Sequence, residues 1–537
     1  MVQVQQRLLI AAGVLAVLAG PLGARRFYED DPIAREPAPL PVANVTKRKI
    51  NEYYDFFQNT FWEPDKGIIK SGRVPRAGAV NTLGEVPDSS WYQNREVACM
   101  TVADLVRGPG TGKPPAMDRP WTVISGKNEG ITPGFLIEDA RGRRFYIKFD
   151  PKSNPEMASA ADVIGSKFFY ALGYNVPENY IVRFNRRQLR VGGEASVVGH
   201  RGRTRAMAER DVDDALERVP RDYEGNYRAL ASLAIAGDLV GPFRYYGTRK
   251  DDPNDVVPHE DRRDLRGLYV FAAWLNHTDS KSINSLDSVV EENGLRFIKH
   301  YLIDFGAILG SDSFEAKSPR AGNVYLFDFK PAAIQFLTLG LDVPAWQRAS
   351  YPHIPAVGRF ESAVFDPERW KSNYPNPAFD SRLPGDTFWA ARKVMAFTDE
   401  QIRALVETGE YSDPRAVDWV ARNLAVRRDK IGRAFFDDVL PLDNFAVHDG
   451  RLAFEDLAVK HGFAQPRAYE VHWSRFDNVA ERASPVAGAG LAIPRELLAA
   501  GQYAAAEIRS GDPRKTVTVY LLTRDSRTRV VGIDRAW

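Results

Sequence analysis

Two short polar runs near the middle of the chain constrain its fold more than any other feature. The first, at 277–284, reads HTDSKSIN, and the second, at 303–306, reads IDFG about twenty residues later. An apolar segment precedes each run: 267–275 (GLYVFAAWL) resembles a helix, and 296–302 (RFIKHYL) resembles a strand. The sequence therefore predicts a helix, a polar loop, a hairpin that turns at Asn293-Gly294, and a second polar turn.

These residue types suit the transfer of a phosphoryl group, which depends on positioning and charge neutralisation. Asp279 would lie beside an acceptor hydroxyl, and Lys281 would neutralise charge on the transferring phosphate. Asn284 and Asp304 would offer Mg²⁺ the oxygen ligands that it prefers. Polar loops also contain Asp, Lys and Asn by chance, so the prediction depends on the two runs occurring in this order at short range.

A β-rich segment upstream would supply the rest of a nucleotide site. Strands are predicted at 134–137 and 144–149, and Lys148 lies inside the second of them. This lysine either extends from a strand edge into solvent or binds nucleotide phosphates. The preceding loop contains Gly126 and Gly130, and it either covers phosphates with its backbone N–H groups or is an ordinary hairpin tip.

A helix is predicted next, at 155–172, with Asn154 as its N-cap and Gly173 at its end. An acidic residue on this helix would pair with Lys148. Glu156 is the first candidate and Asp162 the second. Two further strands, at 179–184 and 188–191, are predicted to form a hairpin.

The order of these features resembles that of atypical kinases, namely the HipA-like and phosphatidylinositol 3-/4-kinase-like groups. The phrase FYIKFDP at 145–151 and the G-x-x-V-P-E run at 173–178 are similar to the HipA-like pattern. The resemblance covers roughly residues 120–440 and implies a kinase-like fold that uses ATP and Mg²⁺. The chain departs from it in lacking a glycine-rich signature and in placing Glu156 early on its helix, which leaves an inactive kinase fold as an alternative.

The predicted fold class is α+β: a two-lobed kinase-like fold with a β-rich small lobe, a helical large lobe and a small C-terminal β-domain. The predicted segments are a signal peptide or anchor at 1–24, a linker and N-terminal extension at 25–118, the small lobe at 119–250, the large lobe at 251–465 and the β-domain at 466–537. An aromatic and polar cluster around Trp91 in the extension is predicted to cover the small lobe, with substrate binding as the weaker alternative. The Arg427-Arg428 pair is predicted to lie on a solvated helix face rather than to form an anion site.

The N-terminus predicts export from a bacterial cell. A basic residue, an apolar run at 8–20 and a small-residue end form a signal peptide cleaved after Ala24, or an uncleaved anchor. The apolar run is shorter than the roughly twenty residues of a membrane span. The mature protein would be periplasmic, in the cell envelope or secreted, with a possible tether at its N-terminus. Cys99 is the single cysteine, and its apolar context predicts a core position.

The predicted function is an exported atypical kinase that transfers the γ-phosphate of ATP to a hydroxyl of a protein, glycan or lipid. The alternative is a catalytically inactive kinase fold that serves as a scaffold or binding protein of the cell envelope. An exported hydrolase is a weaker third hypothesis, because the sequence contains no G-x-S-x-G motif. A net charge of +2 with 26% charged residues gives no indication of nucleic acid binding.

Overall fold

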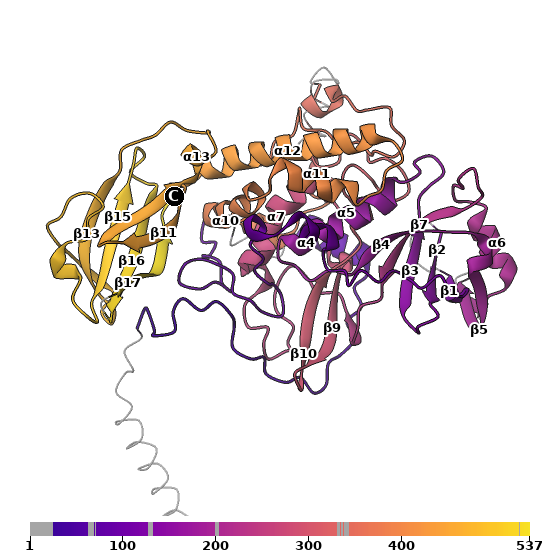
Figure 1. Ribbon diagram of the computed structural model, residues 1–537, viewed down its shortest axis with the longest axis horizontal. Helices are drawn as coiled ribbons and strands as arrows, with labels where there is room; N and C mark the ends of the chain where they lie inside the picture. Colours follow the sequence, from indigo (N-terminus) through magenta and orange to yellow (C-terminus); the bar gives the residue numbers. More distant parts are fainter. Residues whose placement is uncertain are drawn as a thin grey trace, which may run out of the picture. The chain divides into compact units, whose positions relative to one another are not determined.

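A computed structural model describes residues 25–62, 69, 71–126, 133–198, 203–329, 333, 337, 343–525 and 527–537. The predicted signal peptide or anchor at 1–24 and Gly130 lie outside the described residues. The described chain divides into two compact units (Figure 1). The larger contains residues 34–80 and 86–438, and the smaller contains residues 25–33, 81–85 and 439–537.

A seven-stranded sheet forms one end of the larger unit, with strand order β4-β7-β3-β2-β1-β5-β6. Its strands are β1 (Trp121–Gly126), β2 (Gly134–Glu138), β3 (Arg144–Phe149), β4 (Asn179–Phe184), β5 (Leu189–Val198), β6 (Thr204–Ala206) and β7 (Tyr227–Leu233). One face buries large apolar side chains, among them Trp121, Phe145 and Phe184, together with residues of helix α6 (Glu209–Leu216). Because side chains alternate along a strand, Lys148 of β3 lies on the other face.

The predicted hairpin between β4 and β5 is wrong. Strand β4 pairs with β7, and β5 pairs in parallel with β1. The two strands are joined by a 3-10 turn at Arg186–Gln188, where the side chain of Arg186 bonds the carbonyl of Leu189 and the acids Glu209 and Asp213. The chain therefore passes from one part of the sheet to another at this turn.

Helix α5 (Met157–Ala171) follows β3 and is buried along nearly its whole length. It begins two residues later than predicted, because Glu156 has a left-handed backbone (φ 70°) and occupies the N-cap position. After the helix, Gly173 has φ 109° and lies against the ring of Tyr92. A Cβ built on Gly173 would approach that ring to 2.2 Å, so only glycine fits here.

The middle of the larger unit is mainly helical (Figure 1). A three-stranded sheet of order β10-β9-β8 accompanies the helices, and Asn293-Gly294 turns the β9–β10 hairpin as predicted, with positive φ at both residues. The remaining elements of this unit are α2 (Glu52–Phe57), α4 (Val102–Arg107), β8 (Asp238–Gly241), α7 (Arg263–Leu275), β9 (Ser285–Glu292), β10 (Leu295–Leu302), α9 (Pro377–Asp380), α10 (Pro384–Met395), α11 (Asp399–Glu407) and α12 (Pro414–Asp437).

Trp91 does not cover the seven-stranded sheet as expected. Its ring stacks on His300 of β10 at a centroid distance of 3.6 Å and also contacts Phe243 and His259. The guanidinium of Arg262 lies 4.4 Å from the centroid of the same ring. The N-terminal extension therefore packs at this point on the three-stranded sheet and the residues that precede α7.

Two predictions about single side chains are also wrong. Cys99 is exposed, since its 3-10 turn at Val97–Cys99 buries only Val97. Arg427 of α12 is buried, with its guanidinium 3.6 Å from the centroid of Phe365 and its N–H groups bonded to the carbonyls of Glu361 and Ala273. Stacking on aromatic rings and carbonyl acceptors make this burial tolerable.

The smaller unit contains an antiparallel five-stranded sheet of order β14-β13-β15-β16-β17. It also includes the hairpin β11–β12, which precedes the predicted start of the β-domain at residue 466. Its elements are β11 (Leu442–His448), β12 (Arg451–Asp456), α13 (Leu457–Lys460), β13 (Glu470–Asp477), β14 (Arg482–Pro485), β15 (Tyr503–Arg509), β16 (Thr516–Arg524) and β17 (Arg527–Arg535).

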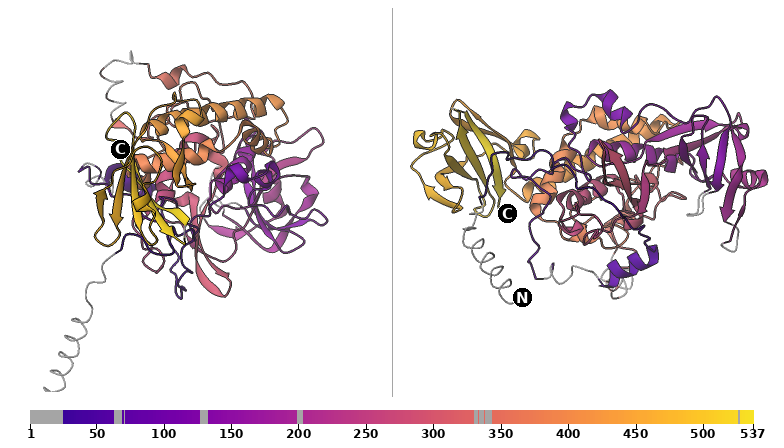
Figure 2. Two further views of the ribbon diagram at one scale, coloured as in Figure 1. Left: turned by 60° about the vertical axis from the view of Figure 1, so that its left-hand side comes forward. Right: turned by 90° about the horizontal axis from the view of Figure 1, so that it is seen from below.

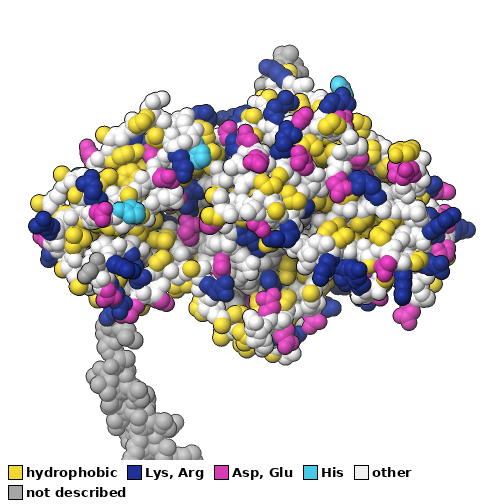
Figure 3. Space-filling view, in the orientation of Figure 1, with side chains coloured by type: hydrophobic (Ala, Val, Ile, Leu, Met, Phe, Trp, Pro, Cys, Tyr) yellow, Lys and Arg dark blue, Asp and Glu magenta, His cyan; other side chains and the backbone are white. Residues whose placement is uncertain are grey.

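The mixed α+β class is thus confirmed: a β-rich sheet, a helical middle region and a C-terminal antiparallel sheet occur in that order (Figures 1 and 2). Among the residues that the structure describes, no helix has the length and apolar character needed to cross a membrane. Side chains of both charge signs are interspersed over the face shown in Figure 3.

Candidate functional site

Lys148 lies between two carboxylates that come from distant parts of the chain. Its Nζ is 2.8 Å from Asp304 Oδ1 and 3.2 Å from Asp162 Oδ2. Burial alone would lower the pKa of Lys148, but the charges of Asp162 and Asp304 outweigh burial and raise that pKa. The ammonium is therefore charged at neutral pH and joins the seven-stranded sheet, helix α5 and the IDFG turn.

The predicted pairing of Lys148 with Glu156 is wrong, and the second candidate, Asp162, is its partner on α5. Glu156 instead accepts hydrogen bonds from the backbone N–H and hydroxyl of Ser412 at 2.8 and 3.1 Å. Glu156 precedes the first helical residue and has a left-handed backbone, so helix geometry does not align it with Asp162. Its carboxylate binds Ser412, while Asp162, inside the helix, meets Lys148.

Asp162 also fastens the IDFG turn to helix α5. Its Oδ1 accepts bonds from the backbone N–H of Phe305 at 3.2 Å and from Asn179 Nδ2 at 2.9 Å. Gly165, one turn along α5, lies against Phe305, where a Cβ would come within 2.6 Å of the phenylalanine Cβ. Burial raises the pKa of Asp162, although Lys148 opposes this effect. The carboxylate thus has three donors around it.

The catalytic loop predicted at 277–284 begins directly after helix α7 and centres on Asp279. Asn284 Nδ2 donates to Asp279 Oδ2 at 2.8 Å, and Lys281 Nζ lies 2.8 Å from Asp279 Oδ1. Asn373 Nδ2 donates to Oδ1 at 3.1 Å. Burial would raise the pKa of Asp279, but Lys281 and the hydrogen bonds overcome it and lower that pKa. The carboxylate is therefore ionised at neutral pH.

The two polar runs meet through their backbones. The N–H of Ile303 donates to the carbonyl of Asn284 at 3.0 Å, so the IDFG turn starts beside the end of the catalytic loop. Asp304 has a left-handed backbone (φ 62°), an uncommon state for a non-glycine residue, and its side chain is 44% exposed. Lys148 and Asp304 thus form one pair of side chains and Asn284 and Asp279 another, and the backbone bond from Ile303 to Asn284 joins the two pairs into a network.

The side-chain oxygens of Asn284 and Asp304 are suitable ligands for a hard divalent cation that is bound together with phosphates. Asn284 uses its amide nitrogen on Asp279, and its side-chain oxygen is the group that suits Mg²⁺. Asp304 supplies a carboxylate close by. Within the described residues, no group of three or more His, Cys, Asp or Glu side chains could hold a metal by itself. A cation held by Asn284 and Asp304 would take its remaining ligands from outside these two side chains, and phosphate oxygens of a nucleotide are suitable ligands.

Gly126 ends strand β1 and pairs with Phe135 of β2. A Cβ on Gly126 would lie 3.1 Å from a methyl group of Val197, so a close strand contact occupies this position. Gly126 is therefore part of the sheet, while Gly130 falls outside the described residues. A nucleotide-covering role for either glycine stays a prediction.

Three contributions to the site were missed by the sequence analysis. Asn373 holds Asp279, as described above. Lys317 is buried and donates to the hydroxyl of Thr278 in the loop, and burial lowers the pKa of its ammonium. Glu52 of α2 accepts a bond from Lys281. All three lie outside the loop in sequence, so no local motif includes them. Only the charge of Lys317 and Glu52 could have suggested that they belong to a polar site.

His277, the first residue of the loop, is buried between aromatic rings. Its ring centroid is 5.7 Å from that of Phe169 and 6.0 Å from that of Phe305. Burial lowers the pKa of His277 to about 4. The histidine is therefore neutral at pH 7 and helps pack the IDFG turn.

We expect His277 to make the larger unit sensitive to acid. Its pKa falls from 6.5 to about 4 on folding, so the unfolded chain takes up a proton first as pH drops below 6.5. The free energy of unfolding should then decrease by up to about 3 kcal/mol between pH 6.5 and pH 4. Urea unfolding at several pH values measures this loss. The loss of stability on acidification should be smaller in His277→Gln and unchanged in the exposed control His353→Gln. An equal loss in both variants would show that His277 is not the group that titrates.

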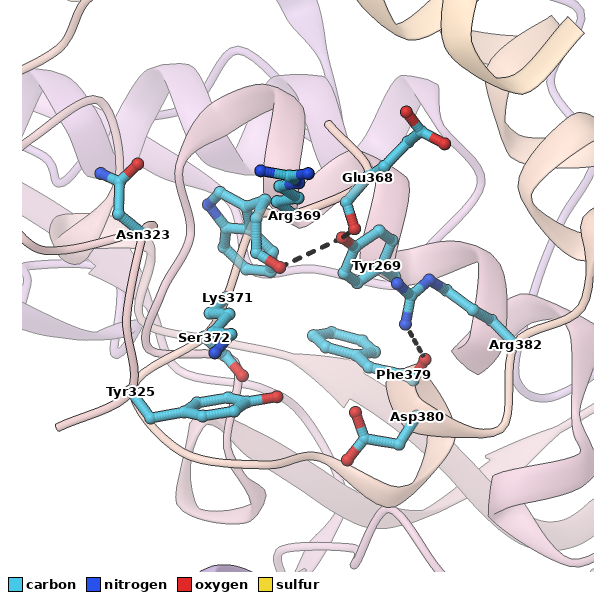
Figure 4. A pocket seen from close by; sticks show the side chains of 11 residues that line it. Tyr269, Asn323, Tyr325, Glu368, Arg369, Lys371, Ser372, Phe379, Asp380 and Arg382 are labelled. Carbon is cyan, nitrogen blue, oxygen red and sulfur yellow. Dashed lines mark hydrogen bonds between the residues drawn. The ribbon is translucent and has the colours of Figure 1, made fainter. Parts of the chain in front are cut away.

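A cavity of about 380 Å³ lies next to the segment that holds Asp279 (Figure 4). Tyr269, Tyr325 and Phe379 contribute rings to it, and Lys371 and Ser372, the residues before Asn373, form part of its wall. Arg382 stacks on Tyr269, with its guanidinium carbon 3.7 Å from the ring centroid. None of the predicted site residues lines this cavity.

No protein-family model matches the sequence, and no curated protein matches it. Among solved structures, the chain is similar to a crystal structure of the Golgi casein kinase with Mn/ADP bound, at 8% identity and a TM-score of 0.30, over 62% of this chain and 73% of that chain. A second crystal structure of the Golgi casein kinase gives 10% identity and a TM-score of 0.29, over 76% of this chain and 96% of that chain. Similarities this low carry no argument, so the functional assignment depends on the geometry.

Proposed function

We propose that the larger unit is an atypical kinase that transfers the γ-phosphate of ATP to a hydroxyl of a protein, glycan or lipid. The observation that carries this proposal is the network from Lys148 through Asp304 and Asn284 to Asp279, which unites residues from a strand, a loop and a turn. We also propose that the larger unit has the β-rich small lobe and helical large lobe of a kinase, and that the C-terminal β-domain is separate from them.

Each residue has a role in the proposed reaction. Lys148 would hold nucleotide phosphates with its charged ammonium, oriented by Asp162. Asp279 would accept a hydrogen bond from the acceptor hydroxyl and take its proton, and Lys281 would face the transferring group. Asn284 and Asp304 would hold Mg²⁺, which when bound neutralises charge on the phosphates. We further propose that the chain works after export, on the basis of its N-terminal apolar run.

Phosphoryl transfer from ATP labelled at the γ position tests the proposal on the full chain. The expected result is Mg²⁺-dependent label on an added acceptor or on the protein itself. Asp304→Ala should abolish it, because the variant loses the carboxylate proposed to hold the metal. A thermal unfolding curve close to that of the wild type would show that the variant is folded. Transfer that survives in Asp304→Ala would reject the assignment.

A second candidate, an inactive kinase fold that serves as a scaffold, is favoured by one specific observation. The ammonium of Lys281 is already engaged by Glu52 and Asp279, so it is not free to meet a phosphate in this state. Glu52→Gln separates the two candidates. An active kinase should keep or increase its transfer rate when this contact is weakened, whereas a scaffold should show no Mg²⁺-ATP binding in either form.

A further inference from the structure

An exposed aromatic surface lies beside the catalytic loop and takes no part in the proposed chemistry. Helix α2 and the turn that follows it, Gln58–Trp62, carry most of it. Tyr53 and Trp62 are 77% and 80% exposed. The aromatic face consists of Tyr53, Tyr54, Phe57, Phe61, Trp62, Phe327 and Phe329. Exposed apolar surface of this kind usually marks an interaction site.

Ring contacts join the four phenylalanines of the aromatic face into one cluster. Phe57 stacks on Phe61 at a centroid distance of 5.6 Å, and Phe61 contacts Phe327 at 5.2 Å. Phe327 in turn contacts Phe329 at 4.6 Å. Rings from two segments more than 250 residues apart in sequence therefore form a single patch. In the right-hand view of Figure 2, α2 is the indigo helix at the lower edge.

The opposite side of α2 is fixed to the catalytic loop. The buried carboxylate of Asp55 accepts hydrogen bonds from Tyr374 at 2.9 Å and from Ser282 at 3.2 Å. Phe56 packs edge-on against Tyr374 at 5.6 Å, and Glu52 binds Lys281. The aromatic face therefore has a fixed direction relative to Asp279, and whatever it contacts is brought close to the loop.

Two exposed lysines precede α2 in the chain, and Asp328, the acid between Phe327 and Phe329, is paired with Lys371. Lys47 and Lys49, just before α2, are exposed, and among the described residues neither forms an ion pair. The two acids of the helix are committed to other contacts, Glu52 to Lys281 and Asp55 to the buried network. The surface that remains combines lysine with Trp, Tyr and Phe.

We propose that the aromatic face docks on the surface of an anionic lipid membrane. Trp and Tyr favour the boundary between lipid headgroups and acyl chains, and neighbouring lysines are attracted to anionic headgroups. The predicted apolar run at 8–20 would deliver the chain to such a surface. In the context of the proposed function, on which this last step rests, docking presents Asp279 to hydroxyls carried by lipids or membrane-bound molecules.

Quenching of Trp62 fluorescence by brominated lipid tests the docking. The full chain is mixed, without nucleotide, with vesicles of phosphatidylglycerol and phosphatidylethanolamine, or of phosphatidylcholine alone. Brominated acyl chains quench only tryptophans that reach the membrane interior. Because the chain has 10 tryptophans, the contribution of Trp62 is the quenching in the wild type minus that in Trp62→Phe. We expect Trp62 to be quenched in the anionic vesicles. Its quenching should decrease at least fivefold in 0.5 M salt, which screens the lysines, or with phosphatidylcholine, which has no net charge.

Matched variants separate this surface from the N-terminal run. Tyr53→Ser with Phe57→Ser should remove most of the Trp62 quenching, while Tyr223→Ser, 97% exposed elsewhere on the larger unit, should not change it. A chain that binds vesicles with Trp62 unquenched is held by its N-terminus alone, and this would overturn the proposal. A dimer that the double variant dissociates without lipid would assign the face to a second copy instead. Because no nucleotide is present, failure of the kinase assay would leave the result unaffected.

Discussion

Asp279→Asn should lower the rate of phosphoryl transfer at least about 100-fold, the usual contribution of a positioned acid or base. The wild-type carboxylate is ionised and accepts bonds from Lys281, Asn284 and Asn373. An asparagine keeps the shape but cannot take a proton from the acceptor, and its own N–H₂ group would face other amide donors. Binding of Mg²⁺-ATP should stay within about threefold, because Asp279 is not among the groups proposed to hold the nucleotide.

The measurement is a comparison of single-turnover transfer rates and nucleotide affinities for Asp279→Asn and a control, Asp525→Asn. Asp525 is exposed at the β16–β17 turn with φ 50°, a conformation that asparagine also adopts readily. The control should transfer at the wild-type rate. If Asp279→Asn transfers as fast as the control, Asp279 has no role in the chemistry and the catalytic loop has been misassigned.

Asp162→Ala should lower the free energy of unfolding of the larger unit by about 2–4 kcal/mol, because it leaves buried donors without their acceptor and leaves the Lys148 ammonium with Asp304 alone. Lys148, Asn179 and the N–H of Phe305 all lose a partner. The Phe305 amide should then exchange its hydrogen faster, since the IDFG turn is no longer fastened to α5. Asp162→Asn retains one oxygen acceptor, so its free energy of unfolding should lie between those of the wild type and Asp162→Ala.

Urea unfolding and hydrogen exchange at residues 303–307 measure these effects. Glu138→Ala is the matched control, because it removes an exposed ion pair with Arg144 from the same β2–β3 hairpin that carries Lys148. It should change the free energy of unfolding by less than about 1 kcal/mol. Equal losses in Asp162→Ala and Glu138→Ala would show that Asp162 does not hold the turn.

Local patterns predicted much of the secondary structure. Two strand-like runs located β2 and β3, and the Asn293-Gly294 pair located the β9–β10 hairpin. These features depend on neighbours in sequence. Strand pairing does not, so the parallel pairing of β5 with β1 was missed, and adjacent strands were joined in a hairpin that the fold does not contain.

Within the candidate site, the sequence identified the residues of the two motifs but not their supports. The choice between Glu156 and Asp162 depended on where α5 begins, and the left-handed Glu156 moved that start. Asn373 and helix α2 reach the loop from nearly 100 and more than 200 residues away. No local pattern indicates contacts at such separations. The exposed Cys99 and the buried Arg427 show the same limit, since apolar or charged context alone did not predict their environment.

Titration of the full chain with ATP, with and without Mg²⁺, tests the central claim most directly, because every proposed role depends on one nucleotide meeting Lys148, Asn284 and Asp304 together. Calorimetry should detect one site that needs Mg²⁺ and that weakens at least tenfold in both Lys148→Met and Asp304→Ala. A wild-type protein that takes up no ATP with Mg²⁺ present, or whose binding is unchanged in both variants, would contradict the account.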